Sequence, residues 1–223
     1  PNELVVLTDN TRDGSWIPTG GDFNNFGGIY RPVSLIETAA AHFDLLYYGT
    51  CGVELDADPA GTVTLKARLT GPTEGTQVEY TLWDGPALCA KALCPAAAPA
   101  TLLRVVNPHL WDGIRDPHLY RCRARLVRGE ETQDQVELPF GFRSIKMTPD
   151  RGFFLNGNHM TICGVSKHQD RAGCACGVTE ADQAEDIAII RELGANAVRL
   201  SHYQHPAHTY DLCDEAGLVV WAE

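Results

Sequence analysis

Asn196-Ala197-Val198-Arg199-Leu200-Ser201-His202-Tyr203 is a short apolar run that ends in polar and aromatic residues. Apolar runs also occupy residues 160–165 and 218–222, and segments with helical character separate the three runs. Apolar strands joined by helices indicate parallel pairing in a sheet whose two faces are both covered. No glycine-rich phosphate loop follows any of these runs, which disfavours a nucleotide-binding sheet. The pattern alone leaves a doubly wound sheet and a (β/α)₈ barrel open.

A well-marked helix is predicted between the first two of these strands, at residues 179–193. Thr179 is placed to cap its first turn, and Asp182 lies at the position that returns the capping hydrogen bond. Gly194 is suited to end the helix. A second helix should begin near Pro206, a residue that favours the first turn of a helix.

The sequence before residue 150 has a different pattern. Runs such as 62–69 and 77–83 alternate apolar and polar residues, as strands do when one face is buried and the other is solvated. Turn signals such as Gly71-Pro72 break these runs at the spacing expected of a β-sandwich. We therefore predict an immunoglobulin-like antiparallel sandwich of about seven strands between residues 40 and 143.

The composition is that of an ordinary globular protein. The 223 residues are 44% hydrophobic and 21% charged, which is enough apolar material for a core. Lys and Arg number 18 against 29 Asp and Glu, and the net charge of −11 would repel nucleic-acid phosphates. No uninterrupted apolar run is long enough to span a bilayer, so neither nucleic acid nor a membrane is an expected partner.

The eight cysteines follow no disulfide-scaffold spacing, and the chain is too long to need such a scaffold. We expect free thiols and therefore a cytoplasmic location. Cys174-Ala175-Cys176 has a gap that fits neither a zinc knuckle nor a redox motif. The chain begins at Pro1 without a leader sequence, but a missing start would leave secretion open.

Polar residues follow the ends of the predicted parallel strands, the edge at which barrels of this kind place their function. His168 comes just after the first strand, Arg199 lies inside the second, His202 ends the second, and Glu223 follows the third. Such a ring would suit a polar ligand with many hydroxyls. Each residue also has a structural interpretation, since a lone histidine is often a satisfied structural residue. An arginine in an apolar strand needs a carboxylate partner, and that pairing can be purely structural.

Three histidines near the second helix have a spacing that could suit metal ligands. His202, His205 and His208 recur every three residues, but Pro206 interrupts them at a helix start. We predict no metal site here, and an unrelated α/β metalloenzyme is kept as an alternative.

Taken together, residues 196–203 and 210–223 closely resemble the signature region of family 2 glycoside hydrolases. The resemblance covers nearly the whole chain in the family's own order. The Lys-His-Gln-Asp and His-Tyr-Gln-His runs are more similar to the β-galactosidase branch than to the glucuronidase or mannosidase branches. The other stretches that carry the resemblance are Gly21-Asp22-Phe23, Gly28-Ile29-Tyr30-Arg31, Asn107-Pro108-His109-Leu110-Trp111, Phe140-Gly141-Phe142-Arg143, Gly152-Phe153-Phe154-Leu155-Asn156-Gly157 and Gly164-Val165-Ser166-Lys167-His168-Gln169-Asp170.

The resemblance implies a multidomain fold of β and α/β parts. Residues 1–38 would be the C-terminal strands of an N-terminal sugar-binding-like β-sandwich. Residues 39–146 would be the immunoglobulin-like sandwich. Residues 147–223 would begin a (β/α)₈ catalytic barrel, or TIM barrel, and end after its third strand, so an exposed sheet edge and a tendency to aggregate are expected.

The resemblance also implies roles for five residues. Asp22 would reach over to the barrel mouth and contact sugar hydroxyls, and His168 and His202 would line the same substrate-binding pocket. Arg199 would support the site by helping to hold the nucleophilic carboxylate. Glu223 matches an acidic position at the end of the third strand, where we expect support and not catalysis.

Two positions depart from the family's pattern. Gln204 stands where many members have proline after His-Tyr, and Lys167 stands where many have arginine before the first histidine. Both changes are compatible with the fold, although lysine cannot reproduce a bidentate arginine contact.

The activity implied by the resemblance is that of a retaining β-glycosidase, most closely a β-galactosidase acting on a carbohydrate. Such enzymes use two carboxylic acids roughly 5 Å apart. In this family the acid/base glutamate follows an asparagine on the fourth strand, and the nucleophile comes near the seventh. The single Asn-Glu pair, Asn2-Glu3, is at the wrong end of the chain. We therefore expect no catalytic residue in these 223 residues and no activity of this polypeptide alone.

Further expectations concern the full-length enzyme. The resemblance implies no cofactor in this segment, and Mg²⁺, Na⁺ and a homo-oligomeric assembly in the full-length enzyme. Glucuronidase or mannosidase specificity is one alternative. A non-catalytic carbohydrate-binding or spacer module is another, because immunoglobulin-like sandwiches often only space other domains.

Overall fold

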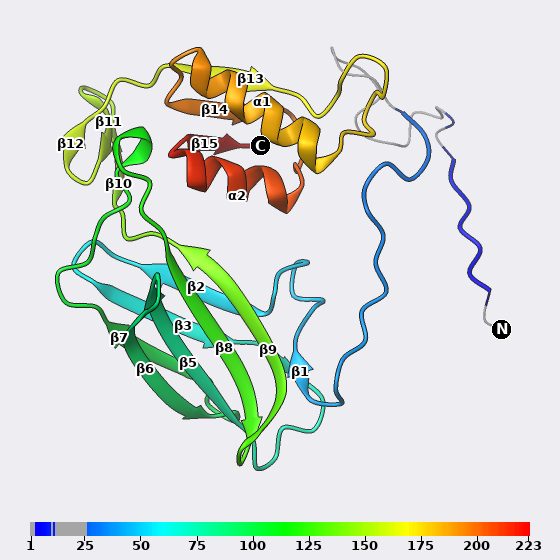
Figure 1. Cartoon of the computed structure of the whole chain (residues 1–223), viewed down its shortest axis with the longest axis vertical. Helices are drawn as coiled ribbons and strands as arrows, with labels where there is room; N and C mark the ends of the chain where they lie inside the picture. Colours follow the sequence, from blue (N-terminus) through cyan, green and yellow to red (C-terminus); the bar gives the residue numbers. More distant parts are fainter. Residues whose placement is uncertain (1–2, 10, 12–25) are drawn as a thin grey trace.

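The computed structural model describes residues 3–9, 11 and 26–223. An antiparallel β-sandwich lies at one end of the molecule and a small parallel sheet with two helices at the other (Figure 1). This arrangement confirms the predicted fold class. Asp22 lies outside the described residues. No helix in the described part of the chain is long and apolar enough to cross a membrane.

The sandwich consists of antiparallel sheets that face each other across one apolar core. The alternation predicted for residues 62–69 is present, since Val63, Leu65 and Ala67 are buried while Lys66 between them is exposed. The run is split at Arg68, whose backbone N–H donates to the carbonyl of Gly52 instead. The sheets have the orders β2-β3-β7, β6-β5-β8-β9 and β1-β4. The strands are β1 (His42–Phe43), β2 (Val53–Ala57), β3 (Thr62–Ala67), β4 (Leu69–Thr70), β5 (Gln77–Asp84), β6 (Ala87–Pro95), β7 (Ala100–Arg104), β8 (Tyr120–Arg128) and β9 (Glu131–Phe140).

A three-stranded antiparallel sheet that was not predicted follows the sandwich, ahead of the strand predicted at 160–165. It comprises β10 (Ile145–Thr148), β11 (Gly152–Leu155) and β12 (Asn158–His159). The predicted strand begins only at Gly164, because the side chain of Asn196 satisfies the backbone just before it. The Asn196 Oδ1 accepts from the backbone N–H of Cys163 at 2.8 Å, and its Nδ2 donates to the Thr161 carbonyl at 2.8 Å.

The last part of the chain alternates strand and helix as predicted. Its elements are β13 (Gly164–Lys167), α1 (Glu180–Glu192), β14 (Ala197–Leu200), α2 (Ala207–Ala216) and β15 (Val219–Ala222). The three strands are parallel in the order β13-β14-β15. The predicted capping box of α1 is confirmed, with Thr179 and Asp182 exchanging hydrogen bonds.

The two helices cover the outer face of the parallel sheet through one apolar cluster. Ile187 and Ile190 of α1 and Cys213 of α2 pack against Val198 and Leu200 of β14. All five side chains are buried. The inner face of the same sheet lines a cavity of about 630 Å³. One face of β14 therefore stabilises the fold and the other faces the cavity.

The sandwich docks against the amino-terminal end of the parallel sheet. Trp111 is buried against Phe153 and Leu155, with Val219 of β15 packed beside them. The indole N–H of Trp111 donates to the carbonyl of Asp214 in α2 at 2.9 Å. This joint lies at the opposite end of the strands from their carboxyl ends, so the carboxyl ends are not covered by the sandwich.

A glycine contact completes the joint and gives a test of it. Gly217 has φ of +72° at the end of α2, and a Cβ there would lie 2.2 Å from the carbonyl oxygen of Gly113. Gly194, at the end of α1, has φ of +79° but open space around it. We expect Gly194→Ala to cost about 1–2 kcal/mol from backbone strain. Gly217→Ala should cost about 1–3 kcal/mol more, because the backbone of Gly113 must also move.

Urea unfolding of the two variants measures this difference directly, since both replace a glycine that ends a helix in the same part of the chain. Equal losses of unfolding free energy would show that the joint does not depend on the close approach of Gly113 and Gly217.

Candidate functional site

The carboxyl ends of the parallel strands bring four of the five predicted site residues to one edge. Ser166, Arg199 and Trp221 are directly opposite each other in the register of β13, β14 and β15. Shortly after these positions come His168, His202 and Glu223, which therefore lie at the same edge of the sheet. This is the edge at which barrels of this class gather their functional side chains.

Arg199, Glu223 and His202 form one hydrogen-bonded network. Nε and Nη2 of Arg199 donate to Oε1 of Glu223 at 2.9 and 2.7 Å. The other carboxylate oxygen, Oε2, lies 2.9 Å from Nδ1 of His202. The hydrogen bond from Arg199, helped by His202, lowers the pKa of Glu223 below its ordinary value. The carboxylate partner that an arginine in an apolar strand requires is thus Glu223.

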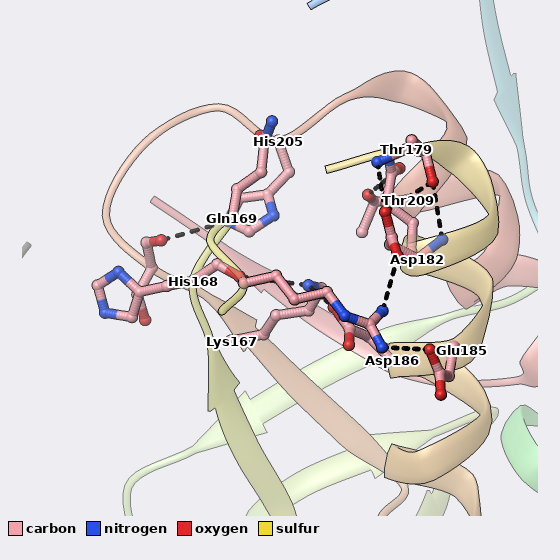
Figure 2. Close-up of polar contacts among 12 residues, drawn as sticks. Lys167, His168, Gln169, Thr179, Asp182, Glu185, Asp186, His205 and Thr209 are labelled. Atoms are coloured by element: carbon pink, nitrogen blue, oxygen red, sulfur yellow. Dashed lines mark hydrogen bonds and ion pairs between the residues drawn. The ribbon is translucent and has the colours of Figure 1, made fainter. Parts of the chain in front are cut away.

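His168 and His202 lie against each other across this edge. Their ring centroids are 5.2 Å apart with the planes at 72°, an edge-to-face arrangement. The Ser201–His202 peptide bond is cis. Figure 2 shows that the His168 side chain points away from the helices, whereas Lys167 points toward α1. The two histidines and Glu223 thus present hydrogen-bonding groups of both kinds at the edge of the sheet, as recognition of hydroxyls requires.

Lys167 lies beneath this edge of the sheet and contacts the residues around it. Its side chain is only 7% exposed and forms an ion pair with Asp186 of α1. Its Nζ also donates to the carbonyl of His168 at 3.2 Å (Figure 2). Lysine at this position therefore holds the start of the β13–α1 loop from below. In the sequence Lys167 is only a departure from the family's pattern, and its partner Asp186, 19 positions further along, was not predicted.

His205 also has a structural place. It is 2% exposed, and its Nε2 lies 3.2 Å from the carbonyl of Ser201. The ring stacks on Tyr203 with centroids 5.4 Å apart. Burial lowers the pKa of His205 below its ordinary value, with smaller contributions from nearby positive groups. His205 is therefore held as a neutral ring beneath the edge.

Among the described residues, no group of three or more His, Cys, Asp and Glu side chains is arranged to hold a metal ion. The expectation of Mg²⁺ and Na⁺ in a full-length enzyme stays a prediction. All eight cysteines are free thiols. Among these, Cys122 and Cys213 are buried, and burial raises the pKa of each to about 12.

Gln169 is a residue at this edge whose place the sequence did not reveal. It is 2% exposed, and its backbone N–H donates to the Tyr203 hydroxyl at 2.8 Å. This contact ties the loop after β13 to the loop after β14. A buried glutamine next to His168 has no periodic signal in the sequence, because its partner lies 34 residues further along the chain.

Two family models match the two parts of the chain. The model described as "Glycosyl hydrolases family 2" matches residues 50–143. The model described as "Glycosyl hydrolases family 2, TIM barrel domain" matches residues 145–223. The chain belongs to glycosyl hydrolase family 2. The boundaries predicted at residues 38 and 146 stay predictions.

Individual relatives in family 2 carry more than one name. A β-glucuronidase of Bacteroides fragilis is 35% identical over the whole of this chain, which covers 34% of that protein. The β-galactosidase large subunit of Lactobacillus helveticus is 38% identical, with 100% of this chain and 35% of that protein covered. The solved structure of an FMN-binding β-glucuronidase from Faecalibacterium prausnitzii has a TM-score of 0.89 and 40% identity. The match covers 93% of this chain and 33% of the chain in that structure. The chain thus spans about a third of the length of these relatives.

The neutral state of buried His205 has a measurable consequence for stability. Because its folded pKa lies below the ordinary 6.5, the unfolded chain binds the proton first as the pH falls. The contribution of His205 to stability is therefore complete above about pH 6.5 and is lost as the pH falls below it. We expect the unfolding free energy of His205→Gln to fall less steeply between about pH 7.5 and 5.5 than that of the unmodified protein.

Urea unfolding at several pH values measures this slope. His159→Gln is the matched control, because His159 lies exposed on β12. Identical slopes for the unmodified protein and His205→Gln would mean that folding does not lower the pKa of His205.

Proposed function

We propose that these residues form one wall of the sugar pocket of a retaining β-glycosidase, an enzyme that releases a terminal sugar from a β-glycoside. The observation that carries this proposal is the network of Arg199, Glu223 and His202 at the carboxyl ends of the parallel strands, with His168 beside it. Membership of family 2 supports the same activity. Asp22, which lies outside the described residues, is proposed to contribute to the same wall.

The wall is proposed to bind sugar and not to transfer protons. One oxygen of Glu223 accepts from Arg199 and the other meets His202, and the pKa of Glu223 is lowered. A general acid for glycoside cleavage needs the opposite shift, a raised pKa that keeps its proton near neutral pH. Glu223 is therefore suited to accept hydrogen bonds and unsuited to protonate a leaving oxygen.

We propose a β-galactoside as the first sugar class, on the motifs around His168 and His202. The charges beneath the edge support a neutral sugar, because Arg199 and Lys167 are both paired with carboxylates. A β-glucuronide is the second candidate. It is favoured by the names of several relatives, among them the B. fragilis protein and the F. prausnitzii structure.

Hydrolysis of nitrophenyl glycosides by the protein expressed from its complete reading frame tests the activity. We expect cleavage of the β-galactoside or the β-glucuronide, with the ratio of their kcat/KM values assigning the sugar class. The 223-residue polypeptide alone should show no pH-dependent cleavage. Failure of the complete protein to cleave any β-glycoside offered would refute the proposed function, and cleavage by the 223-residue polypeptide would refute its inactivity.

A single-residue variant tests the proposed wall. His168→Ala removes one ring of the proposed wall, and the loss of one hydrogen bond to a sugar hydroxyl should lower kcat/KM about tenfold. His159→Ala is the matched control, because His159 lies exposed on the antiparallel sheet. Steady-state kinetics with equal values for both variants would place His168 outside the sugar pocket.

A further inference from the structure

The segment that leads into the sandwich lies against the candidate site. Residues 26–40, called here the leading segment, run from the loop after β13 along the flank of the molecule to β1 (Figure 1). Most residues of the leading segment are exposed. Arg31 is partly buried, and it makes side-chain hydrogen bonds to the barrel part.

Arg31 contacts both of the loops that carry the pocket histidines. Its Nη2 donates to Oε1 of Gln169 at 3.1 Å, and also to the backbone carbonyl of Gln204. Gln169 directly follows His168, and Gln204 comes two residues after His202. One guanidinium nitrogen therefore joins the loop after β13 to the loop after β14.

Neighbouring contacts show that this junction is built into the fold. Gln169, the acceptor of the Arg31 bond, is 2% exposed. Its backbone N–H also donates to the Tyr203 hydroxyl, so the same two loops are joined a second time. Figure 2 shows Gln169 and His168 leaving the end of β13 in different directions. Because the two residues are adjacent in the chain, the position of Gln169 constrains the backbone of His168.

The positive charge of Arg31 also affects the pKa of His205, the buried ring beneath the edge. Burial is the main cause of the lowered pKa of His205, and the positive charges of Lys167 and Arg31 add to it. An arginine suits such a junction because its planar guanidinium offers several donors in fixed directions. A lysine keeps the charge but has no fixed donor geometry with which to join both loops.

We propose that Arg31 is a positioning residue of the sugar pocket. It fastens the leading segment onto the two loops and sets the spacing of His168 and His202. The proposal rests on the proposed function, because it concerns the binding of sugar at those histidines. Docking of the leading segment and binding of the sugar are then coupled, since the same two loops serve both.

Hydrogen exchange and kinetics on the protein expressed from its complete reading frame test this coupling. The variants are Arg31→Gln, which removes charge and geometry, and Arg31→Lys, which keeps the charge. Arg104→Gln is the matched control, because Arg104 is exposed on β7 of the sandwich. With Arg31→Gln we expect amide exchange to quicken about three- to tenfold in the loops that follow β13 and β14. We also expect a rise in KM of similar size, with kcat within about twofold.

Each outcome supports or contradicts the proposed role of Arg31. Arg31→Lys should restore part of the protection, and Arg104→Gln should change neither measurement. Unchanged exchange in both loops of Arg31→Gln would show that Arg31 does not fasten the leading segment to them. Faster exchange with unchanged KM would show that Arg31 does not position the sugar pocket. Faster exchange throughout the sandwich as well would assign Arg31 to general stability instead. The exchange measurement needs no activity. A protein without glycosidase activity would therefore refute the proposed function, and hydrogen exchange would still show whether Arg31 fastens the leading segment to the two loops.

Discussion

Arg199 places a permanent positive charge on the inner face of a sheet whose other residues are mostly apolar, and the candidate site depends on how that charge is compensated. The side chain is 37% exposed, so a partner of opposite sign serves mainly to hold the guanidinium in one position. Glu223, which directly follows the neighbouring strand β15, makes two short contacts to the guanidinium. His202 then binds the remaining carboxylate oxygen. One ion pair thus fixes the relative positions of side chains from β14 and from the residue that follows β15.

The same pair links strand register to the site. Arg199 lies opposite Trp221, so Glu223 projects from the same face two residues later. A slip of one residue between β14 and β15 would turn Glu223 to the helix-covered face and leave the charge of Arg199 without its partner. The sandwich does not disturb this edge, because Trp111 docks at the other end of the strands. The joint with the sandwich and the proposed sugar site therefore lie at opposite ends of the same short strands.

Features that repeat along the chain were predictable from the sequence. The alternation around Leu65 gave a strand of the sandwich, and Thr179 with Asp182 predicted the start of α1. The need of Arg199 for a carboxylate was also foreseen. The antiparallel sheet β10–β12 was not predicted, because its strands have only two to four residues, too few to show a period. The side chain of Asn196 hydrogen-bonds the backbone of Thr161 and Cys163 in place of a neighbouring strand, and no local sequence pattern predicts this contact.

Contacts between residues far apart in the sequence were beyond prediction for the same reason. Arg31 and Gln169 are separated by 138 positions, and neither lies in a repeating pattern. Lys167 shows how a local comparison can mislead. Its difference from arginine implied the loss of a bidentate contact, whereas its side chain forms an ion pair with Asp186 of α1. Such residues are identified by burial and partners, which depend on the completed fold.

Charge also bears on the two sugar classes. A galactoside is neutral, whereas a glucuronide carries a carboxylate, which near this edge would meet Glu223 held in its ionised form. Arg199 and Lys167 cannot offer that anion a full charge, because each is already paired with a carboxylate. Hydroxyl groups need only donors and acceptors, and His168, His202 and Glu223 present these. The edge is therefore suited to the hydroxyls that both sugars share, and the carboxylate of a glucuronide would have to lie on the side of the pocket away from Glu223.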